Sequence, residues 1–294
     1  MENETSKNAF YKSRSLLGRL SASFKFMNEN SVLFLKLGTF VLLPVAIVQG
    51  LYAAFYGNIS PENVFSLGNL IALIVSFLVS VVGICVFNSL IYTLIHKYIE
   101  VGRLPAYQLK DLKHPLLANA KKVFIAGLIT FVLFAVLITL IYLLATLTLY
   151  TLIVTTPLFF FLLVPFIYIE CVYLLEHTTL MDAVKKSFSL GVRTWSSTFA
   201  ILFLMSFLIG AIQLVASLPW FIGLMTGTLA QNAILEGGAG TLPGFYPYLM
   251  FILAGIAFLI TLLSRGAVLI TMAFQYASVE TMRKERLLEE AQDK

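Results

Sequence analysis

Long apolar runs alternate with short polar segments along the whole chain, and the runs are the length of membrane crossings. A helix needs about 20 apolar residues to span a bilayer. The runs predict six transmembrane helices, at about residues 33–55, 66–96, 122–146, 153–175, 196–224 and 246–279. The predicted fold class is therefore all-α, a polytopic membrane protein whose six transmembrane helices form three hairpins.

The longest uncharged segment must contain a turn. No charged residue occurs from Val123 to Ile169. One helix over that segment would extend about 70 Å, more than twice the thickness of the hydrocarbon core. We expect the turn between Thr146 and Pro157, because proline is tolerated at the start of a helix and disrupts its interior.

Basic residues lie on alternate connections between the predicted helices. Of the 20 Lys and Arg residues, all but Arg265 fall in the N-terminal segment with its helix entry, the second and fourth loops, or the C-terminal segment. The first, third and fifth loops contain none. Because Lys and Arg resist translocation, both termini and the even-numbered loops are predicted to be cytoplasmic.

This pattern predicts three parts of the chain: a cytoplasmic or interfacial N-terminal segment (1–30), a six-helix transmembrane domain (31–279) and a charged cytoplasmic C-tail (280–294). Within the first part, apolar residues recur at helical spacing, which favours a helix lying in the membrane interface. The alternative is a disordered tail that precedes the first crossing. The apolar residues concerned are Leu16, Leu17, Leu20, Phe24 and Met27.

Composition supports the membrane class and changes the meaning of the net charge. Only 12% of residues are charged and 59% are hydrophobic, whereas a soluble domain contains about 25% charged residues. The topology already explains the net charge of +5. We therefore expect anionic lipid head groups at the cytoplasmic face as partners, and no nucleic acid. Cys85 and Cys171 both lie in apolar runs, so they indicate no disulfide framework.

Two ionisable residues lie inside predicted spans, Glu170 in the fourth and Arg265 in the sixth. A charge in hydrocarbon is costly and usually faces protein or water with a partner. Both residues lie at a similar depth on the cytoplasmic side of the membrane centre. We predict a buried ion pair between them that joins the two helices. Small residues of the sixth span would allow this close approach: Ala254, Gly255, Ala257, Gly266 and Ala267.

Polar residues surround both members of the predicted pair and define a candidate buried polar site. Tyr173 and His177 follow Glu170 on its own helix face. On the sixth span, Ser264, Thr271 and Gln275 share one face beside Arg265. The site has two interpretations: it fastens two helices together, or it forms a substrate or proton site open to the cytoplasm.

Residues arranged for catalysis or metal binding are missing from the sequence. His96, His114 and His177 have no second His or Cys at helical spacing, and no nucleophile elbow or phosphate-binding loop occurs. We therefore expect no enzymatic activity, no cofactor and no metal site. A membrane-embedded lipid enzyme would require Glu170, Tyr173 and His177 to converge on one opening.

The fourth loop contains a short predicted helix, with Thr179 and Asp182 as a capping pair and Gly191 as its stop. This segment, EHTTLMDAVKKSFSLGVRTWSSTFAILFL (176–204), and the later QYASVETMRKER (275–286) carry a resemblance. The chain resembles a group of uncharacterised bacterial six-helix proteins, which are similar to the membrane domain that anchors some glycerophosphoryl diester phosphodiesterases. The resemblance implies a bacterial cytoplasmic membrane. It transfers no activity, because the catalytic domain of that enzyme is not in this sequence.

These patterns favour a non-enzymatic integral membrane protein that acts as a scaffold or accessory factor in membrane lipid or envelope processes, with a membrane protein as a candidate partner. The alternative is a small transporter or permease with a cytoplasm-facing polar cavity around Glu170 and Arg265. Pro44, Pro165 and Pro219 favour this alternative, because a broken helix exposes backbone to a substrate.

Overall fold

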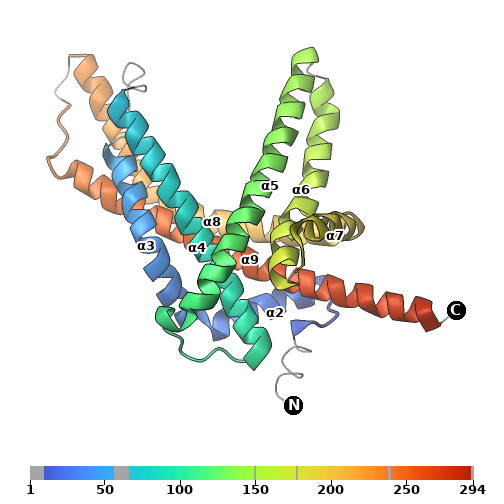
Figure 1. Ribbon diagram of the computed structural model, residues 1–294. Coiled ribbons are helices and arrows are strands. Elements are labelled where there is room, and N and C mark those ends of the chain that lie inside the picture. The colour runs from blue at the N-terminus through green and yellow to red at the C-terminus, as the bar shows by residue number, and fades with distance from the viewer. Residues whose placement is uncertain (1–9, 56–65, 149, 177, 238–239, 293–294) are drawn as a thin grey trace. The chain divides into compact units, whose positions relative to one another are not determined.

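The computed structural model describes residues 10–55, 66–148, 150–176, 178–237 and 240–292, and these residues form helices and no β-strand. This confirms the all-α prediction. Three short elements are α2 (Leu16–Glu29), the 3₁₀ helix η1 (Leu109–Leu112) and α7 (Leu180–Arg193). The long helices are α3 (Ser31–Phe55), α4 (Leu67–Val101), α5 (Lys113–Leu147), α6 (Thr151–Leu175), α8 (Trp195–Leu235) and α9 (Tyr246–Gln292) (Figure 1).

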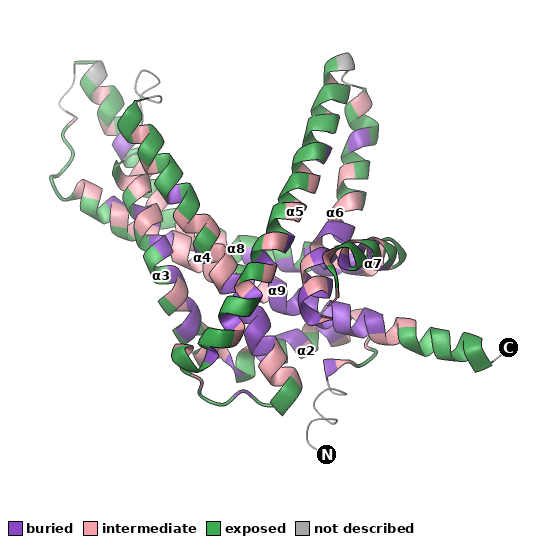
Figure 2. Cartoon of the chain, viewed as in Figure 1, coloured by how far each residue is buried: buried purple, intermediate pink, exposed green. Residues whose placement is uncertain are grey.

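Six helices in the described part of the chain are long and apolar enough to cross a membrane: α3, α4, α5 with the preceding η1, α6, α8 and α9. Their apolar side chains are widely exposed, as Figure 2 shows along α5, where Phe131 is 67% exposed. Apolar exposure over whole helices is unfavourable in water and is compensated when lipid covers the surface. These helices define the class of the chain as a multi-pass integral membrane protein.

Several helices continue beyond the apolar runs that predicted them. α5 begins at Lys113, α8 continues to Leu235 and α9 continues to Gln292. Polar and charged residues end a hydrophobic run without ending a helix, because the backbone hydrogen bonds continue wherever helix formers follow. The residues predicted as a separate C-tail thus continue α9 from Glu280 onward.

The turn between α5 and α6 lies within the predicted segment, but its details differ. Only residues 148–150 separate the two helices, and the Thr151 amide donates to the Thr148 carbonyl at 3.1 Å. Pro157 lies inside α6 and does not open it. Proline inside a transmembrane helix is tolerated where neighbouring groups satisfy the freed backbone.

The chain divides into two compact units. The first contains residues 1–33, 88–205 and 267–294, and the second contains residues 34–87 and 206–266. All Lys and Arg residues except Lys36 and Arg265 belong by sequence to the first unit. The first unit therefore gathers the segments that the charge pattern assigns to the cytoplasmic side.

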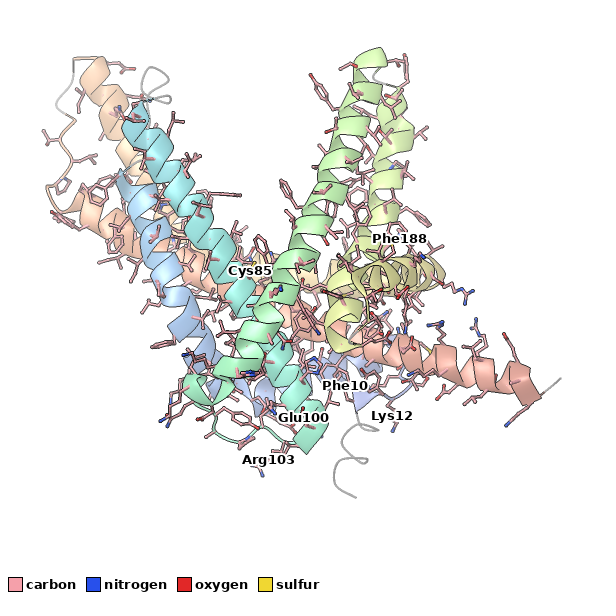
Figure 3. The ribbon with its side chains drawn as sticks, in the orientation of Figure 1. Phe10, Lys12, Cys85, Glu100, Arg103 and Phe188 are labelled. Carbon is pink, nitrogen blue, oxygen red and sulfur yellow. The ribbon has the colours of Figure 1, made fainter. Side chains whose placement is uncertain are left out.

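In the first unit, aromatic rings join α5, α6 and α7. The Phe166 ring of α6 lies 4.9 Å from the Phe134 ring of α5 and 5.5 Å from the Phe188 ring of α7. Figure 1 shows α5 and α6 side by side, and Figure 3 labels Phe188 on α7. Ile169 is fully buried in the same cluster. Pairs of this kind contribute about 0.5–1.5 kcal/mol each beyond the area they bury.

Gly191 lies inside α7, so the prediction that it ends this helix was wrong. The helix continues to Arg193, and Thr179 caps its start by accepting from the Asp182 amide at 3.3 Å, as predicted. Gly191 is buried against α6, where an added Cβ would lie 2.7 Å from Cα of Pro165. The glycine therefore allows α7 to approach the backbone of α6.

Gly191→Ala is expected to lower the free energy of unfolding by about 1–3 kcal/mol, the usual cost of overpacking. Gly127→Ala is the matched control, because a Cβ at that helical glycine meets nothing within 4 Å. The control should be neutral or slightly stabilising, since alanine favours helix more than glycine does. Thermal unfolding in detergent measures both variants. Equal behaviour of the two would contradict the close packing of α7 on α6.

In the second unit, small residues bring α3 close to α9. A Cβ added to Gly50 would lie 2.8 Å from the Phe251 carbonyl oxygen and 3.2 Å from Cα of Gly255. The sequence prediction assigned Gly255 to a contact with the fourth span. In the structure Gly255 instead faces α3, where Gly50 supplies the other small residue that close helix packing requires.

Candidate functional site: a charged pocket in the first unit

The predicted partners Glu170 and Arg265 fall in different units. Glu170 is half-buried in α6, and its Oε1 accepts a hydrogen bond from Nδ2 of Asn88 in α4 at 3.0 Å. Arg265 is exposed in α9 within the second unit. The ion pair between the two residues stays a prediction.

The other residues of the predicted site contact different partners and do not form one cluster. The Tyr173 ring lies 5.9 Å from Nζ of Lys122 in α5. Ser264 accepts a hydrogen bond from Gln213 at 3.1 Å within the second unit. Thr271 is buried and donates to Ser23 of α2 at 3.2 Å. His177 lies outside the described residues. Of this set, Thr271 and Gln275 do share a buried polar face of α9.

Gln275 is the centre of a buried hydrogen-bond network in the first unit. Its Oε1 accepts from Nη1 of Arg19 at 2.8 Å, and its Nε2 donates to Oγ1 of Thr198 at 2.9 Å. The Thr198 hydroxyl is also hydrogen-bonded to the Tyr168 hydroxyl at 2.8 Å. One side chain of α9 thereby joins α2, α6 and α8, and every bond formed reduces the cost of burying these polar groups.

Arg19 is the unexpected member of this network. It is 6% exposed, and its hydrogen-bond acceptors are neutral: Gln275, the Arg14 carbonyl at 2.9 Å and the Met282 sulfur. Burial lowers the pKa of the Arg19 guanidinium from its usual value.

The sequence suggested that the apolar residues of α2 face the membrane interface. In the structure Arg19, Ser23 and Phe26 form the buried face of α2, while Leu17 and Phe24 are exposed.

The segment before α2 is also fastened to α9. The Arg14 amide donates to the Ser278 hydroxyl at 2.9 Å, and the Phe10 ring lies 4.9 Å from the Phe274 ring. Phe10 is 1% exposed; Figure 3 labels it near the start of the described chain. The N-terminal segment is thus part of the packed first unit.

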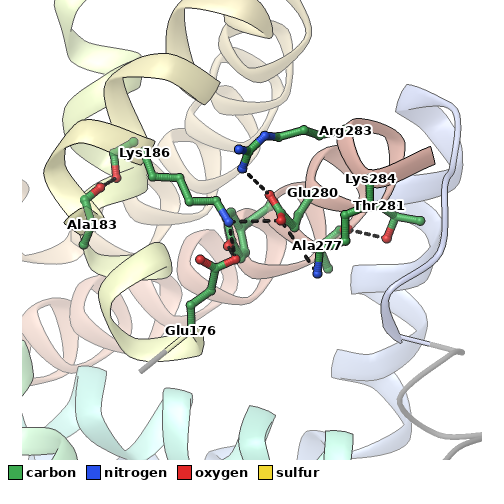
Figure 4. Close-up of polar contacts among 10 residues, drawn as sticks. Glu176, Ala183, Lys186, Ala277, Glu280, Thr281, Arg283 and Lys284 are labelled. Carbon is green, nitrogen blue, oxygen red and sulfur yellow. Dashed lines mark hydrogen bonds and ion pairs between the residues drawn. The ribbon is translucent and has the colours of Figure 1, made fainter. Parts of the chain in front are cut away.

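Next to this segment, one lysine is shared by two carboxylates. Nζ of Lys186 in α7 pairs with Glu176, which follows α6, and lies 3.0 Å from Oε1 of Glu280 in α9 (Figure 4). The Glu280 side chain is only 4% exposed, whereas that of Lys186 is 19% exposed. The Tyr276 hydroxyl donates to Glu176 as well. These contacts fasten the end of α6, α7 and α9 to one another.

Two further cations approach Glu280 from its own helix. Arg283 lies 3.4 Å and Lys284 3.7 Å from its carboxylate oxygens. Both cations are much more exposed than Lys186, so water weakens their attraction. Lys186 is therefore the main buried counter-charge of the cluster.

A pocket of about 900 Å³ opens beside this ion-pair cluster. Its residues come from the N-terminal segment, from the ends of α4 and α6, and from α7 and α9, all within the first unit. This volume lies in the range of small-molecule sites. The lining residues are Tyr11, His96, Ile99, Glu100, Leu175, Glu176, Thr178, Lys186, Glu280, Thr281, Lys284, Glu285 and Leu288.

The pKa of Tyr11 reflects the burial and the negative charges of this pocket. Burial, together with the carboxylates of Glu176 and Glu280, raises the pKa of Tyr11 from 10.0 to about 12. Between these two pH values the folded protein keeps a proton that the unfolded chain has released. The contribution of Tyr11 to stability is therefore fully present below pH 10 and is lost as the pH rises through about 12.

We expect stability to fall with pH over this range, and Tyr11→Phe to make the fall less steep. The test is to measure unfolding midpoints of the wild type and of Tyr11→Phe from pH 9 to about 12, the range over which Tyr11 loses its proton. Identical slopes would mean that Tyr11 does not titrate in this environment.

In comparisons with known proteins, no family model, no curated protein and no solved structure matches the chain. Within the described residues, no group of three or more His, Cys, Asp or Glu side chains is arranged to hold a metal ion.

The sequence does not predict this pocket, and the reason is physical. Glu176, Lys186 and Glu280 lie in polar segments outside the apolar runs, where charged residues are usually solvated. Their burial depends on the packing of α6, α7 and α9. The spacing of the polar residues of α9 gives no signal for Glu280, because this residue lies about 180° around the helix from Thr271.

Proposed function

We propose that this multi-pass membrane protein is a non-enzymatic scaffold or accessory factor in membrane lipid or envelope processes. The observation that carries the proposal is that polar side chains within the spans bond to one another. Gln49 bonds to Ser80, Asn119 to Thr93 and Gln213 to Ser264, in addition to the Gln275 network. Interhelical hydrogen bonds of this kind hold transmembrane helices together.

The pocket supports binding more than catalysis. Its buried carboxylates are held by Lys186 and Tyr276, and a carboxylate engaged in ion pairs is a weak general base. Both acidic and basic side chains line the pocket, which suits recognition of a charged partner. By the charge pattern, this pocket would face the cytoplasm, with anionic lipid head groups around it.

One observation favours the transporter alternative. Oδ1 of Asn88 is buried and has no hydrogen-bond partner within the described residues, and the Nδ2 atom of the same side chain bonds to Glu170. A buried acceptor without a donor is a place where a water or a substrate would be stabilised. Glu170 and Asn88 are thus the first residues to test for a transport pathway.

Native mass spectrometry of the protein extracted with its surrounding membrane separates the two functions. A scaffold predicts a second protein at fixed stoichiometry, retained equally by the wild type and by Glu170→Gln. Arg265→Gln should also retain it. The resemblance to the phosphodiesterase membrane domain predicts that this partner acts on lipids or envelope components.

A different result would contradict the scaffold. If the chain is found without a protein partner, and a small molecule is retained by the wild type and lost in Glu170→Gln, the result supports the transporter alternative. Asn88→Ala should then release the same molecule, because it removes the side chain that holds Glu170.

A further inference from the structure

The end of α9 leaves the packed part of the first unit. Every residue in the range 269–280 is buried, whereas every residue in the range 284–292 is exposed. Figure 2 shows this change along the helix, from purple to green toward the C-terminus. Two adjacent leucines lie in the exposed part, Leu287 at 51% and Leu288 at 66% exposed. A partner that covers them would be stabilised by the burial of apolar surface.

The exposed leucines continue a face of α9 that is already used for packing. Leu287 follows Glu280 by seven residues and Ala273 by fourteen, so these three side chains share one face of the helix. Ala291 extends the same face by one more turn. The face that holds α9 inside the first unit therefore extends beyond the helices that it packs against.

The charges around the leucines cancel. The range 283–292 contains three basic and three acidic residues: Arg283, Lys284 and Arg286, and Glu285, Glu289 and Glu290. A helix that binds an anionic membrane surface or a nucleic acid has an excess of basic residues. This neutral segment therefore favours a protein partner.

The order of the charges favours one particular partner. The basic residues precede Leu287, whereas Glu289 and Glu290 follow it near the end of α9, where no basic residue lies in the last turn. The helix dipole opposes negative charge at a C-terminus by about 0.3–1 kcal/mol. A second copy of the segment that runs in the opposite direction would place its basic residues beside these glutamates. A parallel copy would place like charges together.

The direction of α9 agrees with this arrangement. Figure 1 shows the end of α9 crossing the direction of the α5–α6 hairpin, which belongs to the same unit. Because α5 and α6 are long and apolar enough to span a membrane, the end of α9 is expected to run along the membrane surface. Two copies in one membrane are related by a twofold axis along the membrane normal. This axis makes two such helices antiparallel.

We propose that the end of α9 pairs with the same segment of a second copy of the chain, antiparallel, with the twofold axis beside Leu287. Leu287 and Leu288 of both copies form the centre of the contact. Glu290 of each copy lies beside Arg283 and Arg286 of the other. The contact is small, so the dimer is weak and reversible. The inference does not depend on the scaffold function.

Disulfide crosslinking of the full chain in native membranes tests the arrangement. In a background with Cys85 and Cys171 replaced by alanine, a single cysteine is introduced at Leu287 or at Ala291. Leu287→Cys lies at the axis and should crosslink readily. Ala291→Cys shares its face but would be about 12 Å from its own copy along the helices, beyond the reach of a disulfide. Equal crosslinking at both positions would contradict the antiparallel pair.

Charge reversal tests the partner. Arg286→Glu and Glu290→Arg each change an exposed residue, and each should lower the yield of Leu287→Cys dimers about tenfold, because two attractive contacts become repulsive. Expressed together with tags of different size, the two variants should crosslink to each other as well as the unreversed copies do. Each repulsive contact is then replaced by an attractive one. Lys185→Glu, at an exposed position of α7, is the control and should leave the yield unchanged.

The variants are first compared with the unreversed protein by thermal unfolding, which separates loss of pairing from loss of folding. Dimers that form between the two reversed variants, and poorly within either, support pairing of two copies. The proposal is overturned if Leu287→Cys gives no dimer. It is also overturned if the yield is insensitive to charge reversal, or if the end of α9 is found bound to a different protein in a complex with one copy of the chain.

Discussion

Replacing Lys186 with methionine is expected to lower the free energy of unfolding by about 3 kcal/mol, near the lower end of the cost of breaking a buried ion pair. The substitution removes the ammonium group that contacts both Glu176 and Glu280. Glu280, whose side chain is 4% exposed, would keep the contacts of Arg283 and Lys284, whose side chains are 38% and 66% exposed. The loss arises because two poorly solvated carboxylates lose their shared and least exposed counter-charge.

Lys185→Met is the matched control, because Lys185 is the preceding residue of α7 and is exposed. Its effect should stay within about 0.5 kcal/mol, as for most surface substitutions. Unfolding in mixed detergent micelles measures both variants. Adding Glu176→Gln to Lys186→Met should restore part of the lost stability, because it removes one of the two carboxylates that lose the Lys186 ammonium group. Equal losses for Lys185→Met and Lys186→Met would show that the cluster does not hold α6, α7 and α9 together.

The second large effect is expected for Gln275→Leu, at about 1.5–3 kcal/mol, the range for a hydrogen bond to a charged group. The substitution leaves the buried Arg19 guanidinium without its side-chain oxygen acceptor and also removes a donor to Thr198. The N-terminal segment should then detach from α9 more easily. Faster proteolysis between Arg14 and Lys25 would report this local opening.

Gln213→Leu provides the comparison, since Gln213 bonds only to the neutral hydroxyl of Ser264 among the contacts described. Hydrogen bonds of this kind between transmembrane helices average about 0.6 kcal/mol. The N-terminal segment should remain resistant to protease in this variant. A larger loss for Gln213→Leu than for Gln275→Leu would contradict the special cost of leaving Arg19 unsatisfied.

The residues behind these two predictions differ in how far their roles could be predicted from the sequence. Hydropathy places the six long helices, because the apolar length that a bilayer requires is a local property of the chain. Helical spacing also places Thr271 and Gln275 on one polar face of α9, which the structure confirms by burying both. Local capping chemistry predicts the start of α7 at Thr179 and Asp182.

The sequence does not reveal which charged residues outside the apolar runs become buried. Arg19 and Glu280 resemble solvated charges in the sequence, since each lies among other charged or polar residues. The burial of Arg19 follows from the packing of segments more than 200 positions apart, as its hydrogen bond to Gln275 shows. The contact of Glu280 with Lys186 likewise joins α9 to the distant α7. Gly191 is a similar case, because only the position of Pro165 distinguishes a packing glycine from a helix stop.

The residues of both predictions belong to the first unit. It contains the N-terminal segment, α7, the second half of α9 and nearly all basic residues of the chain, and it forms the charged pocket. In the proposed function this unit faces the cytoplasm. The charge pattern predicts that orientation, with the first and fifth loops on the opposite side.

Cysteine labelling in intact cells tests this orientation most directly. In a background with Cys85 and Cys171 replaced by alanine, single cysteines are introduced at Lys110, Lys185 and Glu290, and on the other side at Ser60 and Thr241. A membrane-impermeant thiol reagent should label Ser60→Cys and Thr241→Cys in intact cells, and the other three only after permeabilisation. Labelling of Lys110→Cys, Lys185→Cys or Glu290→Cys in intact cells would contradict a pocket that opens to the cytoplasm.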